Sequence, residues 1–290
     1  QVSPSIIIVL FSFFFSIFIS ILFGIIRGIY FLPISNPAEI IDYGFNTTIT
    51  GVLPKSNKDE KEKFNGAVES LIVNIQTKMK EDKSCKLISF TSPTASNGKS
   101  FVSREVAINL AALNYKVLLI DLDLKRGDQH KEFNCERLTL NDFNKVNADN
   151  LEQLKVKENL YLMPKLRKLD NTFQFIYSES FNKKIDLFKT KFDYIIFDTA
   201  PILFVSDTSY ILQLSDAVFG ICRHGLTKIN EIKQMDAVLS QIGVNLDGVI
   251  YNYYEKPKSY YGYYGLYGNY NYQYYAQKYL YGDSYYDKED

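Results

Sequence analysis

Three short polar motifs in this 290-residue chain have residue types suited to binding a phosphate group and a divalent cation. The first is the loop SFTSPTASNGKS, which ends in Gly98, Lys99 and Ser100 and precedes an amphipathic run. In such a loop, backbone N–H groups point at an anion, the lysine reaches the outer phosphates of a nucleotide, and the serine hydroxyl binds magnesium. We therefore expect nucleotide contacts from Ser96, Asn97, Gly98, Lys99, Ser100 and Phe101.

This loop departs from the usual G-x-x-x-x-G-K-[ST] pattern at its first glycine, where the chain has Pro93. Proline removes a backbone N–H and fixes φ at about −65°. We predict that ATP binds with the loop rebuilt around Ser96 to Ser100. Taken alone, the motif also fits a serine-rich turn that binds no ligand.

The second and third motifs are aspartates that follow apolar runs. Residues 117–120 precede Asp121 and Asp123 in KVLLIDLDLKRGD, and residues 194–197 precede Asp198 in KFDYIIFDTAPIL. Continuous apolar runs are typical of buried parallel strands, and ligand sites in open α/β sheets lie at the carboxyl ends of the strands. One strand-end aspartate is often only a turn or capping residue, but three ordered strand ends favour a nucleotide site. We expect the magnesium ligands to be Ser100, Asp123 and Asp198.

The spacing of apolar residues indicates the elements that position these motifs. Residues 86–90 form the strand before the loop, and apolar positions in 64–79 recur at helical spacing. Further strands are expected at 160–164, 216–223 and 246–252, and a further helix at 178–192. This alternation predicts an α/β fold, a doubly wound and mostly parallel sheet of the P-loop NTPase type.

Residues 6–26 are 21 residues without a charge, about the length that crosses a bilayer core. A signal peptide is the competing interpretation, but the basic start, short apolar region and small-residue cleavage site are missing. The basic residues lie after this run, which places the following part of the chain in the cytoplasm. The chain begins with Gln rather than Met, which suggests that an earlier part is missing.

We divide the chain into four parts: a transmembrane helix at 1–27, a cytoplasmic connector at 28–63, a nucleotide-binding domain at 64–252 and a tail at 253–290. The tail holds many of the 23 tyrosines, mixed with Gly, Asn, Gln and Lys. A low-complexity segment of this kind builds no packed core, so we expect it to be disordered.

Composition gives no support for a nucleic-acid or zinc-binding function. The net charge of zero gives no reason to expect a nucleic-acid partner. Cys85, Cys135 and Cys222 lie far apart without metal-ligand spacing, as expected of inert thiols in a reducing compartment. The two histidines, His130 and His224, are too few for a zinc site.

The order of the GKS loop, IDLDLKRGD, YIIFDTAP and a tyrosine cluster resembles the bacterial protein-tyrosine kinases, the cytoplasmic part of polysaccharide co-polymerases. The segment NPAEIIDYGFNTTITGVLPKS is similar to the piece that joins membrane and kinase in that family. The resemblance implies that Lys99 and Ser100 are the Walker A pair, that Asp121 and Asp123 form the second motif, and that Asp198 is the Walker B aspartate, with Pro201 after it. Lys99 and these three aspartates would then be the catalytic residues.

The family's tail tyrosines are autophosphorylated. The corresponding acceptors here are Tyr260, Tyr261, Tyr263, Tyr264, Tyr267, Tyr270, Tyr272, Tyr274, Tyr275, Tyr279, Tyr281, Tyr285 and Tyr286. Because the tail is expected to leave the far end of the sheet, we expect the acceptor to come from a neighbouring subunit. Asp121 is expected to accept the proton of the tyrosine hydroxyl.

Three departures from the family pattern stand out. Ala95 replaces a frequent proline, and Lys125 replaces the usual arginine of the second motif. The family's E-x-x-R-x-x-R helix, which packs subunits into a ring, falls at Gly66, Glu69 and Ile72, so its charges are missing. The resemblance therefore supports nucleotide binding more than ring assembly.

The resemblance implies an ATP- and Mg²⁺-dependent tyrosine autokinase in the bacterial inner (plasma) membrane, with its kinase domain and tail in the cytoplasm. Its expected partners are further copies of itself, the polysaccharide export machinery and a tyrosine phosphatase. Two alternatives remain. One is a membrane-linked partitioning-type ATPase, although that class has an early loop lysine where this chain has Thr94. The other is an ATP-binding scaffold with weak kinase activity.

Overall fold

A single β-sheet organises the protein. The structure, a computed structural model, describes residues 4–42, 47–55, 61–79, 84–167, 169 and 171–255. Within these residues eight strands form one sheet in the order β1-β8-β7-β2-β6-β3-β5-β4, and only the β4–β5 pair is antiparallel. The strands are β1 (Ile49–Pro54), β2 (Lys86–Thr91), β3 (Val117–Asp121), β4 (Lys155–Lys157), β5 (Leu160–Met163), β6 (Tyr194–Asp198), β7 (Ala217–Arg223) and β8 (Gly248–Tyr254).

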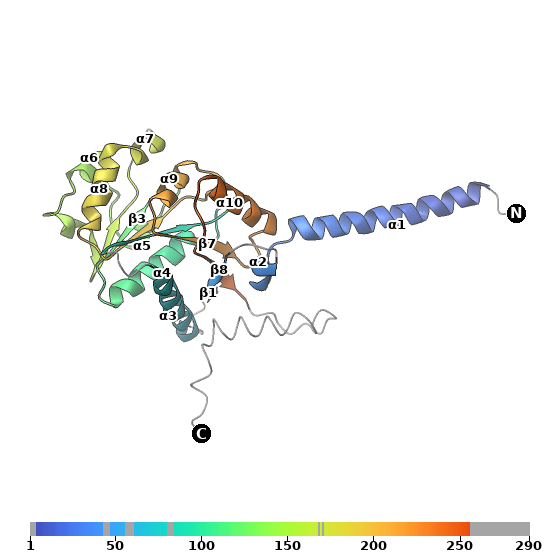
Figure 1. The fold of residues 1–290 in the computed structure, drawn as a ribbon, viewed down its shortest axis with the longest axis horizontal. Coiled ribbons are helices and arrows are strands. Elements are labelled where there is room, and N and C mark those ends of the chain that lie inside the picture. Colours follow the sequence, from blue (N-terminus) through green and yellow to red (C-terminus); the bar gives the residue numbers. More distant parts are fainter. Residues whose placement is uncertain are drawn as a thin grey trace, which may run out of the picture.

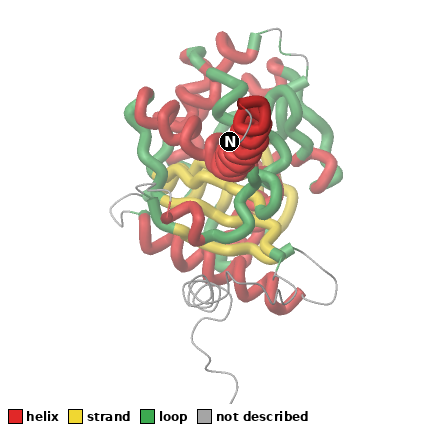
Figure 2. The backbone as a smooth tube through the Cα atoms, turned by 90° about the vertical axis from the view of Figure 1, so that its right-hand side faces the viewer, coloured by secondary structure: helices red, strands yellow, loops and turns green. Residues whose placement is uncertain are grey.

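Helices cover both faces of the sheet, which lies between two helical layers (Figures 1 and 2). On one face lie α3 (Lys61–Lys78) and α4 (Lys99–Ala112). The other face is covered by α6 (Leu140–Lys145), α7 (Thr172–Ile176), α8 (Glu179–Lys189), α9 (Asp207–Gln213) and α10 (Ile229–Gln241). The predicted fold class, a doubly wound and mostly parallel sheet, is confirmed.

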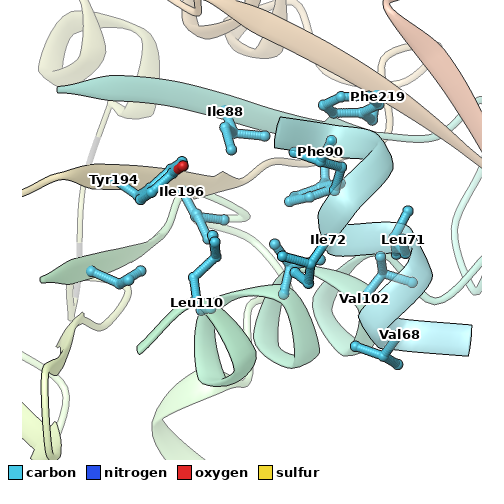
Figure 3. Packing of buried hydrophobic residues seen from close by; sticks show 14 of the residues in the cluster. Val68, Leu71, Ile72, Ile88, Phe90, Val102, Leu110, Tyr194, Ile196 and Phe219 are labelled. Atoms are coloured by element: carbon cyan, nitrogen blue, oxygen red, sulfur yellow. The ribbon is translucent and has the colours of Figure 1, made fainter. Parts of the chain in front are cut away.

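Side chains of the central strands alternate between the two layers. In β3, Val117 and Leu119 pack under α3 and α4, whereas Leu118 and Ile120 pack on the α8 side, and all four are buried. Both faces are therefore apolar, which explains why the strand sequence is a continuous apolar run. Figure 3 shows the layer in which residues of α3 and α4 meet the sheet, among them Val68, Leu71, Ile72, Val102, Leu110, Ile88, Phe90, Ile196 and Phe219.

The structure differs from the expected connector at 28–63. Residues Ile49–Pro54 of that range form β1, which pairs in parallel with β8 at one edge of the sheet. Gly51 lets α3 approach closely, since a Cβ there would lie 2.8 Å from Leu71 Cδ1. The strand was not predicted because ITGVLP is short and contains glycine and proline, which are rare in strand interiors. At the other boundary, β8 continues to Tyr254, two residues into the expected tail.

The helix α1 (Pro4–Phe31) extends away from the sheet (Figure 1). Its segment Ser5–Ile25 has a mean hydropathy of 3.0 and is long and apolar enough to cross a membrane, a property that a signal sequence shares. After α1 the chain returns to the domain, where Ile34 and Ile40, the latter in α2 (Ala38–Asp42), are completely buried beside α10 and β8.

Candidate nucleotide-binding site

The three predicted motifs meet at the carboxyl edge of neighbouring strands. β6 lies between β2 and β3, and Asp198 at its end stands opposite Asp121 of β3 and Phe90 of β2. β2 leads into the loop 92–98, and α4 begins at Lys99. Parallel pairing in this register therefore places the lysine and the two strand-end carboxylates in one site.

Lys99 is a buried cation among carboxylates. The residue is 6% exposed at the first position of α4. Burial lowers the pKa of Lys99, while the charges of Asp198, Asp123 and Asp121 act in the opposite direction. Lys99 therefore faces three carboxylates, with Lys165 also acting on Asp121, so acidic groups outnumber cations at the site.

The pKa values of both Asp121 and Asp198 are raised at this site. Burial raises the pKa of Asp121 well above its usual value, and the Asp198 charge raises it further. Burial also raises the pKa of Asp198, against the opposing effects of the Lys99 ammonium and of hydrogen bonds from Gln129 and Ser100. One oxygen of each carboxylate, Oδ1, is buried without a hydrogen-bond partner among the described residues. A bound cation would relieve both the charge and the unpaired oxygens.

The donor set fits magnesium. Asp123, 9% exposed, and Asp198 offer carboxylate oxygens, and Ser100 offers a hydroxyl. Among the described residues no three acidic, cysteine or histidine side chains converge to hold a metal by themselves. Mg²⁺ keeps several waters and binds through one or two carboxylates together with substrate phosphates, and the Asp123 and Asp198 carboxylates and the Ser100 hydroxyl are oxygen donors of that kind.

The loop before α4 has two left-handed residues, Ser96 with φ 66° and Gly98 with φ 91°. At Gly98 a Cβ would lie 2.2 Å from Asn252 Nδ2, so only glycine fits there. Inside the loop, the Ser92 hydroxyl donates to Thr94 O at 2.6 Å. No side chain in the described part of the chain caps the first turn of α4, so the N–H groups of that turn remain available to an anion.

Two of the six residues expected to contact nucleotide have their side chains engaged inside the protein. Asn97 is completely buried, and its Nδ2 donates to Thr94 O at 2.8 Å. The Phe101 ring packs on Phe64 of α3, with 5.6 Å between ring centroids. Any contact from these two residues would therefore come from their backbone N–H groups.

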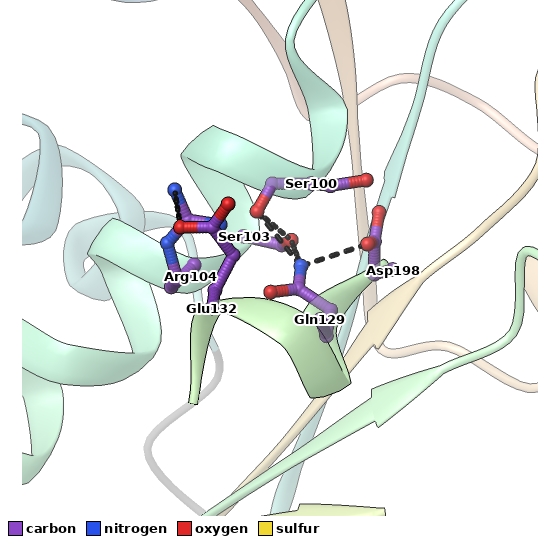
Figure 4. Close-up of polar contacts among 6 residues, drawn as sticks. All are labelled: Ser100, Ser103, Arg104, Gln129, Glu132 and Asp198. Carbon is purple, nitrogen blue, oxygen red and sulfur yellow. Dashed lines mark hydrogen bonds and ion pairs between the residues drawn. The ribbon is translucent and has the colours of Figure 1, made fainter. Parts of the chain in front are cut away.

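Sequence reasoning missed Gln129, the first residue of α5 (Gln129–Glu132). Its side chain lies between α4 and β6 and donates to Asp198 Oδ2 at 2.8 Å and to Ser100 O at 2.8 Å (Figure 4). The signal that could have found it is its place in the chain, since it follows the aspartates of the second motif by a few residues.

A second group of missed residues supports the loop from the β7–β8 side. Arg223 Nη1 donates to Ser96 O at 2.9 Å, and Asn252 Nδ2 donates to Asn97 O at 3.1 Å. The Thr227 hydroxyl donates to Asn97 Oδ1. Arg223 is the last residue of β7, Thr227 lies in the loop after it, and Asn252 lies within β8, but none of them belongs to a recognisable motif.

The strand directions correct one expectation about the tail. Because β8 runs parallel to β7 and β2, it ends at the same carboxyl edge as the site and not at a far end of the sheet. The acceptor tyrosines 260–286 lie outside the described residues. Of the helix positions that align with the family's ring motif, Gly66 and Glu69 are exposed and Ile72 is buried.

Comparison with known proteins agrees with this geometry. The profile of the AAA domain family matches residues 85–243. Tyrosine-protein kinase CpsD of Streptococcus pneumoniae is 34% identical over 205 residues, which are 69% of this chain and 89% of that protein. Tyrosine-protein kinase ptk of Acinetobacter johnsonii is 30% identical over 169 residues, 57% of this chain but only 23% of that protein. The chain thus spans about a quarter of the length of this longer relative.

A solved structure supports the same fold. The kinase domain of the Escherichia coli tyrosine kinase ETK superposes with a TM-score of 0.65 at 21% identity, covering 79% of this chain and all of that domain. The matched range contains the loop before α4 and all three aspartates. The chain therefore belongs to the bacterial tyrosine-protein kinase family within the AAA-domain proteins.

Proposed function

We propose that this chain is an ATP-dependent protein-tyrosine kinase that phosphorylates tyrosines in the tails of neighbouring copies. The observation that carries the proposal is the convergence of Lys99, Asp121 and Asp198 beside the uncapped start of α4, in a chain that belongs to the tyrosine-kinase family. The tyrosine-rich tail supplies hydroxyl groups to receive the phosphate.

Phosphoryl transfer asks a protein mainly for positioning and charge neutralisation. The N–H groups at the start of α4 would bind the phosphates, and Lys99 would neutralise charge on the γ-phosphate. Mg²⁺ held by Ser100, Asp123 and Asp198 would supply further neutralisation. The bond between the γ-phosphorus and the bridging oxygen breaks, the tyrosine oxygen bonds to phosphorus, and ADP leaves.

The tyrosine proton needs an acceptor, because a tyrosine hydroxyl titrates at a pH of about 10. We assign this role to Asp121. Burial and the Asp198 charge raise its pKa well above the usual carboxyl range, so Asp121 has a high affinity for a proton, and a bound cation would keep it in the ionised form that can accept one.

The proposed setting follows the resemblance. Residues 6–26 would hold the chain in the bacterial inner membrane, with the kinase domain in the cytoplasm. There the kinase would act on the polysaccharide export machinery, and a tyrosine phosphatase would remove the phosphates that it adds. Each tail phosphate adds about −1.5 to −2 charges. Repulsion between phosphorylated tails would then separate the copies.

A labelling experiment tests this function against its two competitors. Purified chain is incubated with ATP and Mg²⁺ and assayed for phosphotyrosine and for released phosphate. The kinase predicts tyrosine labelling that falls by about 10²-fold or more in Lys99→Met, because a buried transition-state contact is lost. The exposed Lys183→Met on α8 is the matched control and should label normally.

The other outcomes identify the competitors. Phosphate release without tyrosine labelling would identify a partitioning-type ATPase. Nucleotide binding with neither product would identify a scaffold. Either result would refute the kinase proposal.

A further inference from the structure

Gln129 contacts both strand-end carboxylates of the site. It is completely buried at the start of α5. Its Nε2 donates to Asp198 Oδ2 at 2.8 Å, while its backbone N–H donates to Asp121 Oδ2 at 3.2 Å. One residue therefore fixes the orientation of two carboxylates that belong to different strands.

The same side chain also joins these carboxylates to the nucleotide loop. Its Nε2 donates to Ser100 O at 2.8 Å and lies 3.3 Å from the hydroxyl of Ser103, one turn further along α4 (Figure 4). Both N–H groups of the side-chain amide are thus used by acceptors on α4 and β6.

Three other oxygens in this cluster have no hydrogen-bond donor among the described residues. Gln129 Oε1, Asp121 Oδ1 and Asp198 Oδ1 are all buried and have no hydrogen-bond partner among the described residues. Buried polar atoms normally have partners, and an exception calls for an explanation such as an ion or ordered water. Three buried acceptors on mutually hydrogen-bonded residues suit the waters around a hard cation, since those waters are donors.

We propose that Gln129 is a positioning residue for the magnesium site. Its Nε2 holds Asp198 by Oδ2, which leaves Asp198 Oδ1 available as a ligand, and Gln129 Oε1 would accept a hydrogen bond from a water carried by the ion. The proposal rests on the proposed nucleotide function. A glutamate at this position would place another carboxylate beside Asp198 and lose the N–H donor, so the neutral amide is the chemistry that the site requires.

A purely structural role is the competing explanation, because Gln129 also ties α5 to α4. That connection has a second support, since Arg104 of α4 pairs with Glu132 of α5 at 3.4 Å (Figure 4). Replacing the amide should therefore leave α5 in place, and the two roles can be separated by measurement.

The experiment compares Gln129→Met, which keeps the length but has no amide, with wild type and with Gln153→Met, a control on the exposed side of the short helix Leu151–Leu154. The affinity for a fluorescent ATP analogue is measured in EDTA and during a Mg²⁺ titration. For Gln129→Met we expect affinity in EDTA within about twofold of wild type, and a Mg²⁺ midpoint raised by about 10- to 100-fold, as when other outer-shell partners are lost. Gln153→Met should match wild type.

An unchanged Mg²⁺ midpoint, or an equal loss of affinity with and without Mg²⁺, overturns the proposal. If Gln129→Met does not fold, Gln129→Asn takes its place, because its shorter amide no longer reaches Asp198 and should raise the midpoint in the same direction. Wild-type chain that binds nucleotide with Mg²⁺ but labels no tyrosine would refute the kinase function alone. Wild-type chain that binds no nucleotide would refute both.

Discussion

The Asp121 carboxylate lies against the backbone of Gly127, where there is no room for a side chain. A Cβ on Gly127 would lie 2.0 Å from Asp121 Oδ1, a distance that no side chain tolerates. The Gly127 N–H donates to Asp123 O at 2.6 Å, so the turn that carries both aspartates closes on this residue. The glycine is thus required by close approach and not by an unusual φ.

Gly127→Ala should therefore displace the Asp121 carboxylate or open the turn. Because misplacing a reacting group by about 1 Å can cost about 10²-fold in rate, we expect tyrosine labelling to fall by about that factor while the chain stays folded. Phosphotyrosine assays, with circular dichroism to monitor folding, measure both effects.

Gly66→Ala is the matched control for this substitution. Gly66 lies on the exposed side of α3, and a Cβ there meets nothing within 4 Å. This change should stabilise the chain by about 0.5–1 kcal/mol and leave labelling unchanged. Normal labelling by Gly127→Ala would contradict the assigned role of Asp121.

At the residue scale, the charged residues of the site could be predicted from the sequence, whereas Gln129, which donates hydrogen bonds to two of them, could not. Lys99, Asp121 and Asp198 could be predicted because each stands at a strand end or helix start whose position follows from an apolar run. Gln129 could not be predicted, since the return of its side chain to Asp198 depends on how the loop after β3 folds. Asn97 was assigned to nucleotide although its amide is bound by the protein itself.

At the scale of elements, the loop between β7 and α10 joins the nucleotide loop to the segment that follows α1. The Thr227 hydroxyl donates to Asn97 Oδ1 and accepts from the Arg223 N–H at 2.7 Å. The Thr227 carbonyl accepts from the Ile34 N–H at 2.8 Å. Two parts of the chain that are distant in sequence are therefore connected through one buried threonine.

Thr227→Val keeps the shape of the side chain but removes the hydroxyl. It leaves a buried amide oxygen and a backbone N–H unpaired, so we expect the free energy of unfolding to fall by about 1–3 kcal/mol. The looser loop should also bind the ATP analogue more weakly. Urea unfolding and nucleotide titration measure these effects.

Thr190→Val is the control, because the Thr190 hydroxyl makes only an exposed bond to Leu187 O at the end of α8. It should change stability by less than Thr227→Val and leave nucleotide affinity unchanged. Equal stability and equal affinity in the two variants would show that Thr227 does not support the loop.

Elements were predictable where a local pattern repeats and missed where tertiary pairing decides. The continuous apolar runs of β2, β3 and β6 are typical of buried strands, and the apolar residues of α3 recur at helical spacing. By contrast, β1 forms through pairing with β8 and packing against α3, so the sequence alone did not show that Ile49–Pro54 within 28–63 joins the sheet.

At the scale of the whole molecule, the described chain ends close to its own site. β8 lies two strands from β2, about 10 Å across the sheet, and ends at the same edge as Asp198. The direction of β8 therefore does not by itself require a neighbouring copy to supply the tyrosine. Transfer between copies is consequently a claim that must be tested by separating donor from acceptor.

Mixing two variants of the chain separates the subunit that supplies the phosphate from the one that receives it. One chain carries Lys99→Met and keeps its tail, and the other keeps Lys99 but has phenylalanine at every tyrosine from 260 to 286. The two are mixed with ATP and Mg²⁺, and phosphotyrosine is located by mass spectrometry. Transfer between copies predicts label on the tail of the Lys99→Met chain, which neither chain acquires alone. Label on wild-type chain but none in the mixture would contradict transfer between copies.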